Sequence, residues 1–335
     1  MVSYALSGAF FLEESSDLIV PSMTMNAIIL RRFGGPEVLE VVDVPLPEAG
    51  PGQLRIRVAA SAVHAIDLST RAGILIDAGL LAPRPEIGIG WDVAGEVVAV
   101  GAGVTQFAVG DAVIGLRDLL FACPGAHAEQ VVLDESAVAP APSSVSRAEA
   151  ATLPLNGLTA DRALDLCELE PGQTLAVTGA AGGVGRLLLQ LAALRRLRVV
   201  AVAGADDEQL VRELGATDFV ARTDEVGVAV RRVVPGGADA VVDLANLGIR
   251  AHEALRGGGT FVAVVRPFAP PPIRGTRVVV QEAYADGARL AALAALVDAG
   301  RLRLQVEETF PLVDAARAHE RLTAGGARGG LVLVP

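Results

Sequence analysis

The stretch that most constrains the fold of this chain is LAVTGAAGGVGRLLLQLAAL, residues 175–194. An apolar run that fits a buried strand passes through a turn of glycine and alanine into an apolar run with helical spacing. A second apolar strand, residues 197–204, follows within the length of a βαβ unit. Small residues in such a turn let backbone N–H groups approach a pyrophosphate at the positive end of the helix. The stretch therefore predicts a dinucleotide site, with Gly182, Gly183 and Val184 seating the pyrophosphate.

The composition limits the partners of the chain. Its 335 residues leave room for two domains, and 52% hydrophobic with 20% charged residues is typical of a folded globular protein. The formal net charge of −11 disfavours nucleic acid and anionic membrane surfaces as partners, because both need a cationic surface. All 28 cationic side chains are arginine, so chemistry that depends on lysine is excluded.

The cysteines and the N-terminal segment indicate the cellular compartment in which the protein is expected. Two cysteines, Cys123 and Cys167, are present without a paired spacing, which favours a reducing cytoplasm over a disulfide framework. No apolar run reaches the length of a transmembrane helix. Residues 1–25 carry acidic side chains and lack the basic start of a secretion signal, and we interpret them as an N-terminal extension.

The hydrophobic pattern changes its period along the chain. Residues 26–147 alternate short β-rich runs with glycine and proline turns, which indicates a barrel-like β domain. Residues 148–287 alternate apolar strands with helices, including a strand at 238–243 and a helix at 248–255, which indicates a doubly wound parallel sheet. Residues 288–335 hold the rest of an amphipathic helix and short strands, which we expect to return to the first domain. The predicted fold class is α/β.

A series of motifs spans residues 26–335. They are FGGPEVLEV at 33–41, ASAVHAID at 60–67, GWDVAGEVVAVGAGV at 90–104, GAHAE at 125–129, LPLNGLTA at 153–160, GAAGGVG at 179–185, ELGATDFV at 213–220 and the tail at 309–334. Together they resemble the medium-chain dehydrogenase/reductase superfamily, in its zinc-free quinone oxidoreductase branch. The resemblance implies a GroES-like β-barrel catalytic domain over 26–147 and 288–335, a Rossmann dinucleotide-binding domain over 148–287, and an active site between them. It also implies a homodimer.

Zinc is the first cofactor to weigh, because the superfamily includes zinc alcohol dehydrogenases. A catalytic zinc takes three protein ligands and keeps one position open. The places that match those ligands here hold His64, Trp91 and a residue near Leu155. Since a single histidine does not hold a catalytic zinc, we predict that the chain has no metal site.

The choice between NADP(H) and NAD(H) depends on residues after the second and third strands of the nucleotide fold. NADP-preferring members of the family place a small hydroxylated residue and a basic residue after the second strand, where this chain has Gly204 and Asp206. A carboxylate there suits the free 2′-hydroxyl of NAD. Arg222, after the third strand, favours the 2′-phosphate instead, unless it pairs with Asp206 or Asp224. On the resemblance we place NADP(H) ahead of NAD(H).

The predicted catalytic pocket centres on His64, which stands where the branch usually has asparagine beside the nicotinamide. Its imidazole could protonate the oxygen of the reduced substrate, or it could only pack beside the nicotinamide ribose. Asp67 could orient the imidazole or hold the backbone. Thr159 and the loop that contains Asn246 are expected to border the nicotinamide, and Arg328 to approach the phosphates from the tail.

The remaining histidines are expected to play no chemical part. We interpret His127 and His319 as structural, with His319 on the polar face of a tail helix, and we expect His252 to be exposed.

The function that these features favour is a nicotinamide-dependent, zinc-independent reductase of a small apolar quinone or α,β-unsaturated carbonyl compound. An enoyl-thioester reductase of fatty-acid or polyketide metabolism shares the fold and the hydride step and stays open. An alternative of another class is a non-redox cyclase or nucleotide-binding protein on the same scaffold.

Overall fold

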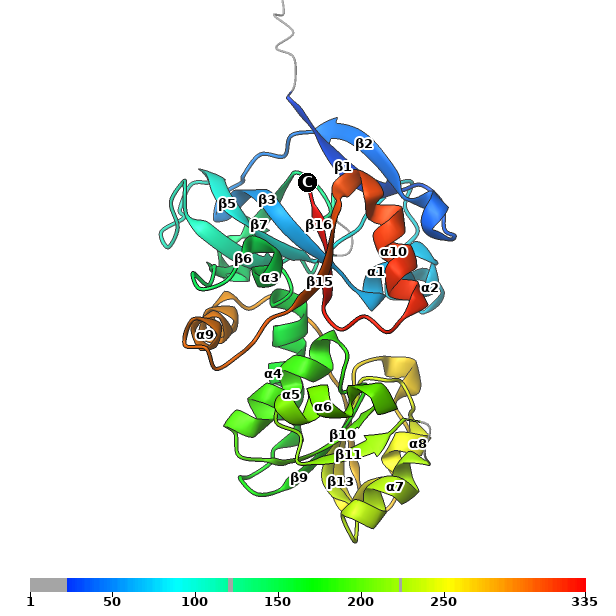
Figure 1. Cartoon of the computed structure of the whole chain (residues 1–335). Coiled ribbons are helices and arrows are strands. Elements are labelled where there is room, and N and C mark those ends of the chain that lie inside the picture. Colours follow the sequence, from blue (N-terminus) through cyan, green and yellow to red (C-terminus); the bar gives the residue numbers. More distant parts are fainter. Residues whose placement is uncertain (1–22, 120–122, 223–224) are drawn as a thin grey trace, which may run out of the picture.

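Two lobes joined by one long helix make up the chain in the computed structural model (Figure 1). The structure describes residues 23–119, 123–222 and 225–335. The linking helix, α4 (Pro154–Cys167), packs against strands of both lobes. Residues 1–22 of the predicted extension lie outside the described residues, whereas Met25 is a buried part of the first strand.

The β-rich lobe is built on two antiparallel-dominated sheets. The larger has the order β15-β16-β3-β5-β6-β8, with β7 also paired to β3, and the smaller has the order β2-β1-β4. The strands are β1 (Thr24–Leu30), β2 (Glu40–Pro45), β3 (Gln53–Val63), β4 (Ile87–Gly88), β5 (Asp92–Val100), β6 (Ala112–Leu116), β7 (Gln130–Asp134), β8 (Val138–Pro140), β15 (Val306–Pro311) and β16 (Gly330–Val334). The helices are α1 (Ala65–Arg71), α2 (Ile74–Asp77), α3 (Arg147–Ala150) and α10 (Ala315–Ala324).

The nucleotide lobe is a single parallel sheet with the strand order β11-β10-β9-β12-β13-β14. Its strands are β9 (Thr174–Thr178), β10 (Arg198–Ala203), β11 (Asp218–Ala221), β12 (Ala238–Asp243), β13 (Leu255–Ala263) and β14 (Arg277–Val280). Its helices, with α4, are α5 (Gly183–Leu194), α6 (Glu208–Glu213), α7 (Val226–Val233) and α8 (Ile249–His252). Helix α9 (Gly287–Asp298) follows the sheet in the chain and packs against α4 and against β8 of the β-rich lobe. This is the Rossmann order, in which ligands bind at the switch point between β9 and β12. The predicted α/β class and doubly wound sheet are confirmed.

Strand β9 lies at the centre of the sheet and is the most enclosed part of the nucleotide lobe's core. Every residue of β9 is buried, as expected for a parallel strand covered by helices on both faces. The apolar face of α5 packs on it through leucines such as Leu187 and Leu188. The same cluster of buried side chains continues through α4 to Trp91 and Ile114 in the β-rich lobe. One cluster of the hydrophobic core therefore spans both lobes.

The tail of the chain returns to the β-rich lobe. β16 pairs antiparallel with β3, with Leu331 opposite Val63, and parallel with β15. The pairing brings the last strand next to the residue that precedes His64. Among the helices of the described ranges, none combines the length and the apolar character needed to cross a bilayer.

Candidate active site

The glycine turn after β9 leaves the start of α5 accessible. Gly179 has φ +62, and Gly182 is the residue that precedes α5. A Cβ on Gly185 would lie 2.4 Å from the Gly179 carbonyl oxygen, so the helix packs on the turn only because residue 185 is glycine. Gly182 and Gly183 are exposed and Val184 is half-buried. The first N–H groups of α5 can therefore receive an anion.

The loop after β12 is held against the end of β9. The Thr178 hydroxyl donates to Asp243 Oδ1 at 2.6 Å, and the Gly248 N–H donates to Asp243 Oδ2 at 2.7 Å. Within the loop Asn246 has φ +56, and its Oδ1 is buried without a donor among the described residues. A buried acceptor without a donor is costly, and a ligand that offers an N–H or O–H group would satisfy it. This observation fits a nicotinamide nucleotide at the switch point.

A buried ion pair marks the boundary of the lobes. His64 follows β3, Asp92 begins β5, and His64 Nε2 lies 2.6 Å from Asp92 Oδ2. Asp92 is 0% exposed and His64 is 9% exposed. Burial lowers the pKa of His64, but the charge of Asp92 and its hydrogen bond outweigh burial, so the pKa lies above its ordinary value. The pair supplies an imidazole that readily holds a proton.

Asp67 holds the backbone rather than the imidazole. Its carboxylate accepts from the N–H of His64 at 2.8 Å and from the N–H of Gly90 at 3.1 Å. Of the two roles predicted for this residue, the structure therefore places it in the backbone role. The partner of the imidazole is Asp92, which our sequence reasoning missed. The signal that was available is a carboxylate in GWDVAG, at the start of an otherwise apolar strand.

Thr159 lies on the helix that touches the ion pair. The Leu155 N–H, in the first turn of α4, donates to Asp92 Oδ1 at 2.8 Å. Thr159 is four residues further along α4 and is buried, so it faces the same side of the helix as Leu155.

The tail reaches the loop that follows β10. Arg328 Nε lies 3.1 Å from Asp207 Oδ1, and Arg328 Nη2 donates to the Asp206 carbonyl at 3.0 Å. A Cβ on Gly204 would lie 3.0 Å from the Asp207 carboxylate and 3.9 Å from the Arg222 guanidinium. The carboxylate that lies over Gly204 thus belongs to Asp207, which follows the predicted Asp206. Asp224, a predicted partner of Arg222, lies outside the described residues.

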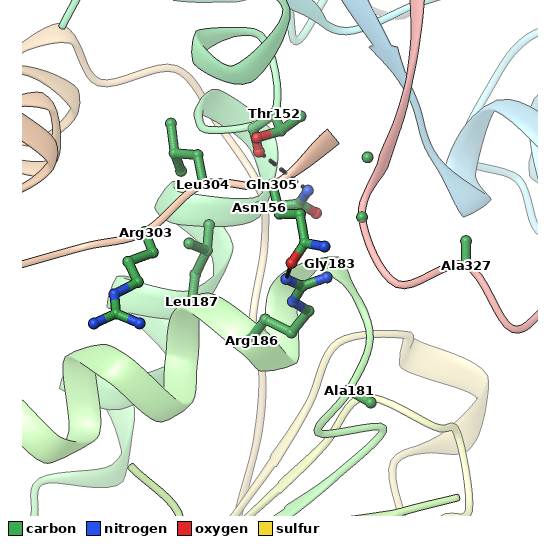
Figure 2. A pocket seen from close by; sticks show the side chains of 12 residues that line it. Thr152, Asn156, Ala181, Gly183, Arg186, Leu187, Arg303, Leu304, Gln305 and Ala327 are labelled. Carbon is green, nitrogen blue, oxygen red and sulfur yellow. Dashed lines mark hydrogen bonds between the residues drawn. The ribbon is translucent and has the colours of Figure 1, made fainter. Parts of the chain in front are cut away.

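A pocket separates the glycine turn from the tail (Figure 2). Its walls include Ala181 and Gly183 from the turn and Ala327 from the tail. Arg186 on α5 crosses it, donating to Gln305 Oε1 and to the Arg328 carbonyl. The tail is therefore attached both to α5 and to the loop after β10. It closes one side of the predicted nucleotide site.

A smaller pocket adjoins the ion pair. It is lined by Thr70, Ile89, Gly90, Trp91 and Arg117. Two of these residues connect the pocket to the ion pair, because Gly90 is held by Asp67 and Trp91 precedes Asp92.

Comparison with known proteins gives matches over both lobes. The family described as alcohol dehydrogenase GroES-like domain matches residues 50–143, and the family described as zinc-binding dehydrogenase matches residues 214–333. The quinone oxidoreductase of Pseudomonas aeruginosa is 32% identical and covers 90% of this chain and 97% of its own length. The chloroplastic NADPH-dependent alkenal/one oxidoreductase of Arabidopsis thaliana is 31% identical over 96% of this chain and 82% of its own length.

The chain belongs to the medium-chain dehydrogenase/reductase superfamily, in its quinone oxidoreductase branch. The solved quinone oxidoreductase of Coxiella burnetii superposes with a TM-score of 0.82 at 30% identity, covering 93% of this chain and 100% of its own. These findings confirm the family and the GroES-like plus Rossmann architecture. As a member of this branch, the chain is an oxidoreductase that uses a nicotinamide cofactor.

In this medium-chain dehydrogenase/reductase the other three histidines are all buried. His127 and His319 lie in the β-rich lobe with ring centroids 6.3 Å apart, and Arg71 Nη1 lies 3.3 Å from His319 Nδ1. The expectation that His319 occupies a polar helix face is wrong, because α10 turns this residue toward Arg71 and the core. His252, expected to be exposed, is buried with its Nε2 2.8 Å from the Thr276 hydroxyl.

Proposed function

We propose that this chain is a zinc-independent, NADP(H)-dependent reductase that transfers hydride to a quinone or to an alkene conjugated with a carbonyl group. The observation that carries the proposal is the His64–Asp92 pair, an acid with limited solvent access placed where the β-rich lobe meets α4. Support for the substrate class comes from the relatives, which are named for quinones and for alkenals and alkenones.

The residues around the glycine turn would hold the cofactor. Gly182, Gly183 and Val184 would seat the pyrophosphate at the start of α5. Asn246 Oδ1 would accept a hydrogen bond from the nicotinamide carboxamide or the ribose, which would satisfy its buried oxygen. Thr159 on α4 would border the nicotinamide.

The surroundings of Gly204 support NADP(H) over NAD(H). Arg222 reaches this glycine, and Arg328 is held one loop away by Asp207. Two guanidinium groups can form charge-assisted hydrogen bonds with a 2′-phosphate. Asp207 opposes them, because a carboxylate repels a dianionic phosphate. Asp206 contributes its backbone carbonyl to Arg328 and so helps to hold the tail.

The protein's own chemistry is to position the reactants and to supply a proton. Bound in this site, the reduced nicotinamide supplies the hydride. His64 donates the proton to the substrate oxygen, and Asp67 fixes the backbone of His64 for that purpose. Trp91 gives the pocket an apolar wall, which suits a planar conjugated substrate and excludes water.

The donors at the site support metal independence. His64 is engaged by Asp92, and Trp91 occupies a place where the zinc enzymes of the superfamily carry a ligand. Among the described residues no group of three or more histidine, cysteine, aspartate or glutamate side chains is placed to hold a metal. Such a site would need three ligands on one ion.

A homodimer is the second part of the proposal. β14 is the last strand of the parallel sheet, so its outer edge is open for pairing. The segment between β13 and β14 exposes Val265, Phe268 and Ile273. A second copy of the chain would cover this edge and its apolar flank. Analytical ultracentrifugation tests the dimer, and Val279→Lys on β14 should shift it toward monomer.

The free cysteines, Cys123 and Cys167, suit a reducing cytoplasm.

Calorimetry and absorbance test the enzyme proposal. The chain should bind NADPH more tightly than NADH in titration calorimetry. The absorbance of the reduced cofactor should then fall with a quinone or an enone, and more slowly with an enoyl thioester. Faster loss with the thioester would favour the acyl reductase, and binding of neither nucleotide would sink the reductase proposal. Added zinc or a chelator should leave the rate unchanged.

A further inference from the structure

The segment between α10 and β16, residues 325–329, lies on the side of the β-rich lobe that faces the nucleotide lobe (Figure 1). We call this segment the strap. Ala327 and Gly329 of the strap line the same pocket as Ala181 and Gly183 of the glycine turn (Figure 2). A dinucleotide whose pyrophosphate is seated at the start of α5 therefore lies beside the strap.

The backbone and the guanidinium of Arg328 are held by three different elements. The Arg328 N–H donates to the Glu307 carboxylate on β15, and its carbonyl oxygen accepts from Arg186 on α5. Its guanidinium pairs with Asp207, in the loop after β10, at 3.1 Å, and donates to the Asp206 carbonyl at 3.0 Å. The strap is thus docked on both lobes through this one residue.

The two ends of the strap differ in how tightly they pack. Gly325 and Gly326 both have φ +72, and an added Cβ at either residue would meet no atom within 4 Å. A Cβ on Gly329 would lie 2.5 Å from the Glu307 backbone nitrogen, so this end is packed closely on β15. The glycine pair can rotate without disturbing a neighbour, which lets residues 326–328 swing away from the pocket once their docking contacts break.

Arg186 is the contact that ties the strap to the helix of the predicted pyrophosphate site. Its side chain is buried, and it donates to Gln305 as well as to the Arg328 carbonyl. A planar guanidinium suits this place, because its fork of N–H groups can serve two acceptors at once. Burial lowers the pKa of Arg186, and the charges of Asp207 and Glu307 oppose this effect. The same two carboxylates hold the strap, so Arg186 belongs to its docking contacts.

We propose that the strap must release before a dinucleotide can enter or leave, and that Arg186 is a positioning residue that keeps the strap closed beside the bound cofactor. This rests on the proposed function, because it requires a dinucleotide at the glycine turn. No bond to the cofactor and no proton transfer is involved. The pyrophosphate is common to both dinucleotides, so closure should slow the loss of NADPH and of NADH alike.

Hydrogen exchange of the free protein tests the docking of the strap without any cofactor. The Arg328 N–H is hydrogen-bonded to Glu307, so its exchange with solvent reports how often the strap opens. Arg186→Met keeps an apolar stem and removes the donors. Exchange of the peptide that covers residues 325–330 should be about fivefold faster in this variant. Exchange at the wild-type rate would overturn the role of Arg186.

The matched control is the same substitution at the other end of α5. Arg195 pairs with Asp161 at 2.6 Å and with Asp165 at 2.8 Å, both on α4. Arg195→Met therefore removes ion pairs of the same helix without touching the strap, and exchange of residues 325–330 should stay at the wild-type rate. Equally fast exchange in both variants would mean that the strap responds to any loosening of α5, which would overturn the specific role of Arg186.

Stopped-flow displacement measures the release of the cofactor. Arg186→Met should raise the dissociation rate constant about 10-fold for both NADPH and NADH, while the association rate constant changes less than about threefold. The effect on turnover should appear in the KM for NADPH rather than as a loss of kcat. Arg186→Lys should recover only part of the slow release, because an ammonium lacks the planar fork. An unchanged dissociation rate in a variant whose strap exchanges faster would overturn the proposed closure.

The wild type alone also decides the proposal if Arg186→Met fails to fold. Saturating NADPH should slow the exchange of residues 325–330, because the strap has to stay closed beside the bound cofactor. Unaltered exchange in a protein that binds NADPH would overturn the strap. A protein that binds neither dinucleotide would instead overturn the proposed function, while exchange in the free Arg186→Met variant still decides whether Arg186 docks the strap.

Discussion

The guanidinium of Arg328 pairs with the carboxylate of Asp207 at 3.1 Å and so joins the C-terminal tail to the loop after β10. The same carboxylate lies over Gly204, and the Arg222 guanidinium lies near the same position. The cations Arg222 and Arg328 and the anion Asp207 therefore lie around Gly204. This is the predicted place of the 2′ group, which is a phosphate in NADP(H) and a hydroxyl in NAD(H). Because Arg328 is already paired, Arg222 is the cation that a 2′-phosphate meets first.

Replacing Arg222 should separate NADPH from NADH. In Arg222→Ala the Kd for NADPH should rise about 5- to 10-fold, the value of one partly exposed charge-assisted contact, whereas the Kd for NADH should change less than twofold. Asp207→Asn should instead lower the Kd for NADPH relative to the Kd for NADH, because it removes a carboxylate that repels the 2′-phosphate. Titration calorimetry at two salt concentrations measures the Kd of each dinucleotide in each variant. Arg212→Ala is the control, since Arg212 is paired with Glu208 on α6. Equal losses for both dinucleotides would contradict the assignment of Arg222.

Asp243 should matter for cofactor binding although it lies beneath the site. Asp243→Ala leaves the Gly248 N–H without its acceptor and releases the loop that carries Asn246. We expect a loss of about 1–3 kcal/mol in the free energy of unfolding and weaker binding of both dinucleotides. Urea unfolding and calorimetry measure the two effects.

The matched control for Asp243 is at the other end of the same strand. Asp239 accepts from the Thr174 N–H and from Arg256 at the amino end of β12. Asp239→Ala should lower stability while leaving dinucleotide affinity intact, because ligands bind at the carboxyl ends of these strands. Weaker binding in Asp239→Ala to the same degree would mean that the loss in Asp243→Ala reflects general destabilisation.

The glycine turn should tolerate no side chain at residue 185. The Cβ of Gly185→Ala would meet backbone oxygen of Gly179 at 2.4 Å, and backbone cannot rotate away as a side chain can. We expect dinucleotide affinity to fall more than 10-fold because the start of α5 must shift. Gly257→Ala is the control, since its nearest neighbour would lie 3.6 Å away. Fluorescence titration with NADPH compares them, and unaltered affinity in Gly185→Ala would show that the turn adapts.

Local patterns in the sequence predicted the centre of the fold well. The run at 238–243 gives β12 at the predicted residues, because its alanines and valines are buried as expected for a parallel strand covered on both faces. The predicted helix at 248–255 is wrong in extent: α8 ends at His252, and β13 begins at Leu255. β13 runs through the glycines at 257–259, and the pairing of β12 with β13 shifts register in this region. Local propensity disfavours glycine in a strand, and tertiary pairing overrode it here.

The site was harder to predict than the fold. The glycine turn is local, so its geometry follows from consecutive residues. The partner of His64 is 28 residues away and depends on how the end of β3 meets the start of β5. Asp67, three residues from His64, was the nearer carboxylate in sequence, but α1 turns it to the backbone. Pairing across strands is not encoded in spacing along the chain.

A buried cluster in the β-rich lobe links stability to pH. His319 is enclosed by α10 and the sheet, with Arg71 at 3.3 Å and His127 edge-on to its ring. Burial and the nearby charges of His127 and Arg71 lower the pKa of His319 to about 3. Burial also lowers the pKa of His127. A proton on the His319 ring would be placed next to the Arg71 guanidinium.

Acid should therefore destabilise this protein well before its carboxylates titrate. The His319 pKa is lower in the folded than in the unfolded chain, whose ordinary value is 6.5, so below this pH the unfolded state binds the extra proton. Stability should fall by about 1.4 kcal/mol for each pH unit below 6.5 from this residue alone. His319→Gln keeps an acceptor for Arg71 and cannot titrate, so its free energy of unfolding should decline less steeply between pH 6.5 and 4. Urea unfolding at several pH values gives the slope of the free energy of unfolding against pH for the variant and for the wild type. Parallel slopes for variant and wild type would show that the acid sensitivity comes from other groups.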